Sequence, residues 1–256
     1  IADDFKNVPD QEDEAIRDLV RARADFRTAL RKVKQQINAF LLRHGIDYPG
    51  KTKWSKAHLT WLTTIKIAQP AQQIALTEYL DAMENNEARV TRITNQLESF
   101  CHTWRLRAVV QALQSMRGIS FVSAVTIIAE LGDLNRFDKP TQLMSYLGLV
   151  PSEHSTGNSI KKGGITKTGN THARKALIES AQAYRLPARK SISIRKRQQN
   201  VSEEVLAVSW DAQLRLCGRY RRLKARGKKH NVVITAIARE LAGFIWSIAR
   251  QVPVAV

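Results

Sequence analysis

The sequence predicts an all-α fold in which a long antiparallel coiled-coil hairpin precedes a helical domain containing a helix-hairpin-helix-like element. Three observations favour this class. Helix breakers are few, with 12 Gly and 7 Pro in 256 residues. Two long segments repeat apolar residues every seven positions, and no run has convincing strand periodicity. We expect residues 1–110 to form the coiled-coil hairpin region and residues 111–256 to form a C-terminal domain.

The two long helices are expected over residues 10–44 and from Pro70 onward, on either side of a connection with a short amphipathic piece around residues 54–67. Gly45 ends the first helix. The heptad positions of the two helices are Leu19, Phe26, Val33 and Phe40, then Leu76, Met83, Val90 and Leu97. Such a hairpin has three possible roles: a dimerisation arm, a spacer, or the long helices of one bundle. The sequence does not distinguish between them.

Residues 113–132, LQSMRGISFVSAVTIIAELG, predict two helices joined by a tight turn at Arg117-Gly118-Ile119. This pattern is typical of a helix-hairpin-helix, in which backbone N–H groups of the turn and of the second helix bind a DNA phosphate. We therefore expect Arg117, Gly118 and Ser120 to contact DNA. An ordinary turn between two helices with a glycine cap explains the same residues.

Four further helices are expected, each with a recognisable start. Their ranges are 141–147, 172–184, 203–225 and about 232–249. Asp138 is the expected N-cap of the first, Asn170 or Thr171 of the second and Ser202 of the third. An Arg/Lys-rich linker is expected around Pro187.

The net charge is +18, from 41 Lys and Arg against 23 Asp and Glu. Residues 1–150 hold 20 basic and 17 acidic residues, whereas residues 151–256 hold 21 and 6. A basic half of this density attracts polyanions by releasing their counterions, so nucleic acid, and DNA first, is the expected partner. A solvated basic surface without a partner is the alternative.

The segment 155–170, STGNSIKKGGITKTGN, combines four Gly, five Ser or Thr and three Lys. Glycines allow a backbone to approach phosphates, lysines neutralise them, and hydroxyl groups can attack phosphorus. It has no GxxxxGK[ST] pattern and is therefore not a Walker A loop. The DNA contacts expected here and at the start of the next helix are Lys161, Lys162, Lys167, Asn170, Arg174 and Lys175.

Several classes of protein are disfavoured. Cys101 and Cys217 form no CxxC pair, which argues against a disulfide framework or a cysteine zinc site. No stretch approaches ~18 consecutive apolar residues, and the start is acidic rather than signal-like. We expect a cytoplasmic protein with no membrane partner.

Three blocks of the sequence carry a family resemblance. They are RGISFVSAVTIIAELGDLNRF, LMSYLGLVPSEHSTG and KKGGITKTGNTHARKALIESA, which together cover about residues 113–185. They resemble the C-terminal domain of the insertion-sequence one-ten/one-sixteen transposases, which are DEDD recombinases with a RuvC-like N-terminal domain. PDQEDEAIRDLVRARADF and FLLRHG are similar to the coiled-coil region of that family.

The resemblance implies a bacterial, nucleoid-associated enzyme that cuts and rejoins DNA strands. It implies a serine nucleophile in His154-Ser155-Thr156-Gly157, for which we choose Ser155, with Thr156 as the alternative. It also implies Mg²⁺ held by the RuvC-like domain and a structured noncoding RNA as a further partner. From the heptads of the coiled coil we expect a homo-oligomer. We expect no metal ligands in this chain.

The family's RuvC-like domain should precede Pro9, and the chain begins at Ile1, so we expect this chain to lack it and to be incomplete and inactive alone. The acidic residues near the start are Asp3, Asp4, Asp10, Asp13 and Glu14. We expect them to be solvated or to complement a helix dipole. The competing hypothesis is a noncatalytic nucleic-acid-binding module or an inactive transposase remnant.

Overall fold

The computed structural model describes residues 10–153 and 162–254 of the chain. It contains long helices and one small β-ribbon, which confirms the all-α class. The chain folds into two compact units. One comprises Arg21–Leu97, and the other comprises Ile1–Val20 together with Glu98–Val256.

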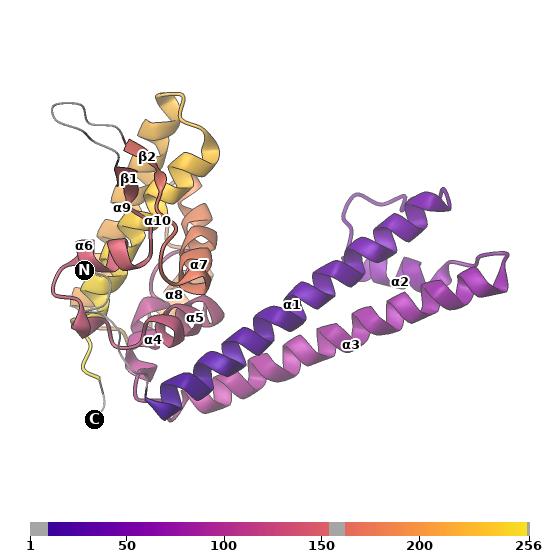
Figure 1. Cartoon of the computed structure of the whole chain (residues 1–256), viewed down its shortest axis with the longest axis horizontal. Coiled ribbons are helices and arrows are strands. Elements are labelled where there is room, and N and C mark those ends of the chain that lie inside the picture. Colours follow the sequence, from indigo (N-terminus) through magenta and orange to yellow (C-terminus); the bar gives the residue numbers. More distant parts are fainter. Residues whose placement is uncertain (1–9, 154–161, 255–256) are drawn as a thin grey trace. The chain divides into compact units, whose positions relative to one another are not determined.

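The unit Arg21–Leu97 is built on a pair of antiparallel helices, α1 (Gln11–Arg43) and α3 (Pro70–Cys101), with α2 (Lys56–Thr64) in the connection between them (Figure 1). Arg23 Nε donates to Thr94 Oγ1 at 2.7 Å. Farther along, Lys34 Nζ lies 3.7 Å from Glu87 Oε1, and the rings of Phe40 and Tyr79 lie 5.9 Å apart. Residue numbers rise on α1 as they fall on α3, so the predicted antiparallel order is confirmed. Coiled-coil packing and dimerisation stay predictions.

The core of this unit lies where α2 meets the two long helices. Its buried side chains are Ile37, Phe40, Leu41, Leu62, Leu76 and Met83. Three of them are heptad positions of the sequence, and they face inward because a seven-residue spacing keeps side chains on one side of a helix. Ser55 starts α2 by accepting a hydrogen bond from the His58 N–H.

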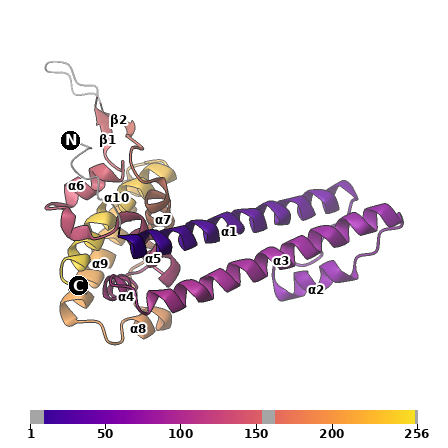
Figure 2. The ribbon, with the colours of Figure 1, turned by 60° about the horizontal axis from the view of Figure 1, so that its bottom comes forward.

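The second unit packs its helices around α10 (His230–Ala249), which contacts α4, α6, α7 and α9 (Figures 1 and 2). The bounds of these four are Arg107–Leu113, Pro140–Tyr146, Thr171–Ala181 and Glu203–Ala225. Within the described ranges, α10 alone is long and apolar enough to cross a membrane. Its inner face, which includes Ile237 and Leu241, is fully buried by the neighbouring helices. We therefore describe α10 as the core helix of this unit.

The remaining helices are α5 (Phe121–Leu131), α8 (Ile192–Arg197), η2 (Leu134–Arg136) and η3 (Gln182–Arg185). Two sequence expectations are wrong in detail. The linker after Pro187 contains α8, which Ser191 caps and buried Ile194 anchors. The N-cap of α6 is Lys139 rather than Asp138, because Pro140 takes the first helical position. The predicted caps Asn170 and Ser202 are confirmed.

One antiparallel ribbon joins β1 (Pro151–Glu153) and β2 (Lys162–Ile165). Pro151 lies opposite Ile165, and Glu153 lies opposite Lys162. The sequence predicts no strand, because no run has convincing strand periodicity. The Pro, Gly and Lys residues of this ribbon also have low strand propensity. Backbone pairing, rather than side-chain preference, forms this ribbon.

Candidate nucleic-acid interface

The turn between α4 and α5 is packed tightly against α7. Gly118 has φ +82°, and a Cβ built there would lie 2.3 Å from the carbonyl oxygen of Ser180. Only glycine fits such a position. Ser120 is exposed and caps α5 by accepting from the Ser123 N–H at 3.4 Å. The two predicted helices and the tight turn between them are therefore present, with Gly118 packed against α7, and the helix-hairpin-helix role in DNA binding stays a prediction.

Arg117 is directed into the protein. Its side chain is 9% exposed, and Nη1 donates to the Pro187 carbonyl oxygen at 2.6 Å and to Gln213 Oε1 at 3.2 Å. The same Gln213 oxygen accepts from the Arg189 N–H at 2.8 Å. Arg117 thus ties the turn before α5 to α9 and to the segment after η3. These contacts give it a structural role in place of the expected phosphate contact.

The ribbon continues into two segments that lie against each other at its base. The Thr166 N–H donates to the Val150 carbonyl oxygen, and the Lys167 N–H donates to that of Gly148. A Cβ on Gly148 would lie 2.4 Å from the Thr168 oxygen, and one on Gly169 would lie 1.8 Å from the Tyr146 oxygen. Both glycines have positive φ. The two glycines are therefore required for close backbone packing between 146–149 and 166–170.

Arg174 fastens these segments to α7. It is 8% exposed, and Nη1 donates to the carbonyl oxygens of Leu147 at 2.9 Å and Thr168 at 2.7 Å. The sequence predicts a DNA contact for Arg174 at this helix start. The structure shows another role, since Arg174 satisfies backbone oxygens that the tight turns leave buried.

Asn170 has both ends of its side-chain amide engaged. Oδ1 accepts from the Ala173 N–H at 2.9 Å, which caps α7, and Nδ2 donates to Glu130 Oε2 at 2.6 Å. Lys167 and Lys175 are exposed, and Lys167 has φ +58°. Of the expected basic contacts that the structure describes fully, these two lysines are the ones open to a ligand.

Glu130 is a buried acid of α5 that the sequence analysis missed. Its side chain is inaccessible to solvent, its Oε2 accepts from Asn170, and Arg17 Nε lies 4.0 Å from the same oxygen. Arg17 Nε also donates to the Ala129 carbonyl oxygen at 2.8 Å. A signal was present, because Glu130 is the one charge in the apolar run TIIAELG. A buried carboxylate needs partners of this kind.

Ser155, Thr156 and Lys161 lie outside the described residues, and for Lys162 the structure gives only the strand position in β2. The two strands that flank this segment are described. Their far ends, Glu153 and Lys162, are paired with each other.

A further set of basic side chains lies on α8 and around the end of α9. Its exposed members are Arg195, Lys196, Arg221, Arg222, Lys224, Arg226, Lys228 and Lys229. Arg219 and Arg215, by contrast, pair with Glu240 at 2.6 and 3.1 Å. Most of the run 219–229 is therefore available to a polyanion.

No group of three or more His, Cys, Asp or Glu in residues 10–153 and 162–254 is arranged to hold a metal ion. The described acids near the start have protein partners: Asp13 accepts from Trp104 Nε1 at 2.8 Å and pairs with Arg105, and Glu14 pairs with Arg17. Burial raises the pKa of the Cys101 thiol to about 11, which keeps it protonated at neutral pH. The donor set in this part of the chain does not fit Mg²⁺.

The sequence of the chain is similar to those of known transposases. Residues 110–194 match the transposase IS116/IS110/IS902 family. The chain is 49% identical over 246 residues to "Putative transposase y4qE" of Sinorhizobium fredii, covering 95% of this chain and 59% of that protein. It is 30% identical over 181 residues to "Probable family 20 transposase" of Pseudomonas aeruginosa (69% and 52%). The identity to "Transposase for insertion sequence element IS1533" of Leptospira borgpetersenii is 25% over 232 residues (86% and 64%). The chain thus spans just over half to two thirds of the length of these relatives.

Proposed function

Because the chain belongs to the transposase IS116/IS110/IS902 family, we propose that it forms the DNA-binding part of a transposase and supplies the serine nucleophile for strand cleavage and rejoining. The observation that carries this proposal is the anchored base of the β1–β2 ribbon. Backbone pairing, two close glycine contacts and the Arg174 hydrogen bonds hold the ends of the segment that contains Ser155. Rigid support of this kind is what a reactive group needs.

In the proposed step, Ser155 Oγ attacks the phosphorus of a DNA phosphodiester, with Thr156 as the alternative hydroxyl. An O–P bond to the serine forms while the bond to the 3′ oxygen breaks, and the proton lost by the serine hydroxyl is matched by the proton that the 3′ oxygen gains when it leaves as a hydroxyl group. The 5′-phosphoserine then retains the energy of the broken linkage, so that a new 3′ hydroxyl can rejoin the strand by the reverse attack.

DNA contacts are proposed for the exposed residues of this surface. Lys167, Lys175 and Ser120 are open in the described structure, and Lys161 and Lys162 flank the same ribbon in sequence. Phosphate contacts of lysines are independent of base sequence. Arg117, Gly118, Asn170 and Arg174 are assigned a supporting role instead, because their side chains or backbones are used inside the protein.

Family membership is compatible with a metal requirement, but the described residues do not form an Mg²⁺ site and no step is assigned to a metal here. A structured RNA, homo-oligomerisation through the helical hairpin and association with the nucleoid are further proposals for the whole protein.

The nucleophile is tested in a full-length relative such as y4qE, in which the serine that matches Ser155 is replaced by alanine. We expect loss of the covalent protein–DNA adduct on denaturing gels, with affinity for DNA changed by less than about twofold, because the hydroxyl is not a phosphate-neutralising group. The matching Thr156→Ala variant is the control. Adducts that persist in the serine variant and vanish in the threonine variant would move the role to Thr156.

DNA contact is tested in this chain with Lys167→Gln and Lys175→Gln. We expect each substitution to reduce the slope of log K against log salt concentration by about 0.9, because each removes one phosphate contact. Lys32→Gln, at an exposed position of α1, is the matched control. Unchanged slopes in both lysine variants would remove this face of the ribbon base from the DNA interface.

A further inference from the structure

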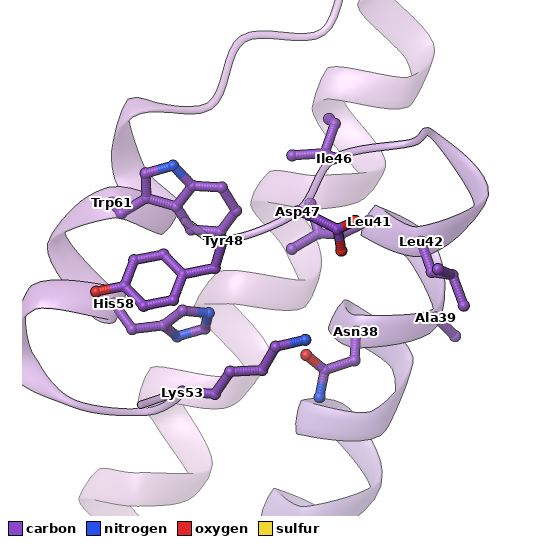
Figure 3. A pocket seen from close by; sticks show the side chains of 10 residues that line it. All are labelled: Asn38, Ala39, Leu41, Leu42, Ile46, Asp47, Tyr48, Lys53, His58 and Trp61. Carbon is purple, nitrogen blue, oxygen red and sulfur yellow. The ribbon is translucent and has the colours of Figure 1, made fainter. Parts of the chain in front are cut away.

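A pocket lies at the end of the helical hairpin, far in sequence from the proposed DNA-binding surface. It has a volume of about 180 Å³ and lies between the end of α1, the loop 46–53 and α2. Tyr48, His58 and Trp61 line one side, and the Lys53 ammonium and the Asn38 amide point toward each other on another (Figure 3). The space corresponds to about six liquid-water volumes, which suits one planar heterocycle rather than a larger ligand.

The aromatic side of the pocket is fixed in place by the backbone. A Cβ on Gly50 would lie 2.5 Å from the Tyr48 ring, so the ring lies directly over that residue. Trp54 adopts φ +64°, an uncommon conformation for a bulky residue. Its backbone N–H donates to His58 Nδ1 at 3.1 Å. Ring centroids of Tyr48 and Trp61 lie 5.1 Å apart. The local strain is concentrated where the aromatic rings are positioned.

Polar groups at this pocket carry unused hydrogen-bonding capacity. No side-chain hydrogen bond or ion pair joins Asn38, Asp47 or Lys53 to the part of the chain that the structure describes. His58 is 1% exposed, and because its Nδ1 accepts a hydrogen bond, its neutral ring carries the proton on Nε2. An amide, a carboxylate and an ammonium group beside aromatic rings offer donors and acceptors to a flat polar ligand.

The segment around the pocket carries the positive charge that binding to a nucleic-acid backbone requires. Residues 43–69 contain five Lys or Arg and one acid, Asp47, and they hold two of the five tryptophans of the chain. The basic residues, all exposed, are Arg43, Lys51, Lys53, Lys56 and Lys66. Basic groups that neutralise a backbone, together with aromatic rings on which bases stack, are the two features of single-strand binding sites.

We propose that this pocket binds one unpaired base of a single-stranded nucleic acid, stacked on the Trp61 ring beside Tyr48, with its polar edge at Asn38 and the adjacent phosphate at Lys53. A paired base is excluded because its edges and faces are already occupied within the duplex. The site lies entirely within the unit Arg21–Leu97 and does not rest on the proposed catalytic function.

The test measures fluorescence anisotropy of labelled oligomers of about 10 nucleotides with the full chain, in separate single-stranded RNA, single-stranded DNA and duplex DNA arms. We expect Trp61→Leu to weaken binding in at least one single-stranded arm by about fivefold or more, the effect of losing one stacked base. Trp61→Phe should recover part of the loss, Asn38→Ala should weaken binding about threefold or more, and duplex affinity should change less than twofold. The arm with the larger loss identifies RNA or DNA as the source of the base.

Lys66→Gln is the matched control, since Lys66 is exposed on the same segment but does not line the pocket. Equal losses for Trp61→Leu and Lys66→Gln would overturn the proposal in favour of charge alone. Ultraviolet cross-linking of the unaltered chain, followed by peptide mass measurement, should place the base on Tyr48 or Trp61, and a cross-link found only elsewhere would also overturn it. If Trp61→Leu changes the oligomeric state in light scattering while single-strand affinity is unaltered, the pocket is a contact between copies of the chain and the proposal is wrong.

Discussion

In this protein, which has a net charge of +18, some basic side chains stabilise the fold by donating hydrogen bonds to backbone oxygens. Arg174 and Arg117 are basic residues of the block that resembles the transposases, and both donate to backbone oxygens inside the protein. A guanidinium group has five donors in a planar fork, so it can satisfy several carbonyl groups at once. Lys167 and Lys175, which are exposed, are better placed for phosphates.

At the same scale, His58 makes the hairpin end sensitive to pH. Burial, and to a lesser extent the nearby Lys53, hold the pKa of the His58 imidazole below its usual value. The unfolded chain therefore binds more protons than the folded chain as the pH falls below about 6.5. The stabilisation is present above that pH and is lost as the pH falls toward the lowered pKa.

We expect hydrogen exchange at the α2 amides to accelerate between about pH 7 and pH 5, after correction for the intrinsic rate, and the acceleration should be smaller in His58→Asn. Asparagine keeps an acceptor near the Nδ1 position for the Trp54 N–H but does not titrate. His102→Asn, at an exposed position outside this unit, is the control. A pH response that is the same in His58→Asn as in the unaltered chain would contradict this assignment.

At the scale of elements, α5, the ribbon and α7 act as one assembly. Glu130 on α5 accepts from Asn170, Asn170 caps α7, and Arg174 on α7 holds the backbone of both segments at the ribbon base. Two of these contacts are long-range, since Glu130 and Asn170 are 40 positions apart in sequence and Leu147 and Arg174 are 27 positions apart. The orientation of the ribbon base on α7 therefore depends on a buried polar network, and such networks tolerate the loss of a member poorly.

Replacing Glu130 tests this network. We expect Glu130→Leu to lower the free energy of unfolding by about 3 kcal/mol, because Asn170 and Arg17 lose a buried acceptor, and Glu130→Gln to lower it by about 1 kcal/mol. Hydrogen exchange should accelerate first at the Ala173 amide, which Asn170 caps.

Glu179→Gln, at an exposed position of α7, should change the free energy of unfolding by less than about 0.5 kcal/mol and is the matched control. If Glu130→Leu leaves the exchange of the first turn of α7 unchanged, the proposed link between α5 and the ribbon base is wrong.

At the scale of the whole molecule, the chain combines two units with separate cores. Ile37 belongs to the core where α2 meets α1 and α3, and Ile237 belongs to the core around α10, and both are fully buried. The excess of basic residues does not follow this division, because it is concentrated in residues 151–256, which form only part of the larger unit and hold 21 of the 41 Lys and Arg but only 6 of the 23 acids. The lysines proposed to contact DNA, Lys167 and Lys175, lie in this basic segment of the unit that contains the ribbon.

Separate cores predict separate responses to cavity formation. We expect Ile37→Ala to destabilise Arg21–Leu97 by about 2–5 kcal/mol, and Ile237→Ala to do the same for the other unit, each because a cavity replaces packed side-chain atoms. Site-resolved hydrogen exchange of both variants measures the two effects. Loss of protection in both units from either substitution would show that the chain unfolds as one cooperative body.

The class of fold, the positions of most helices and the family could be predicted from the order of the residues. Apolar spacing and capping residues act locally, which is why residues 10–44, the start at Pro70 and the helix Glu203–Ala225 with its Ser202 cap could all be predicted. The candidate nucleophile Ser155 and the exposed lysines also came from the sequence, as predictions that the described structure does not test.

Contacts between distant segments, by contrast, set which of the predicted basic residues are exposed and which are hydrogen-bonded inside the protein. Arg117 and Arg174 donate to carbonyl groups of Pro187 and Leu147, which lie 70 and 27 positions away in sequence. Glu130 likewise contacts Asn170 across 40 positions. The ribbon and the pocket at Tyr48 and Trp61 arise in the same way, from the approach of backbone segments whose residue types have little local preference for those positions. Local propensity depends on neighbouring residues in the sequence, whereas burial and hydrogen-bond partners depend on distant segments that pack together.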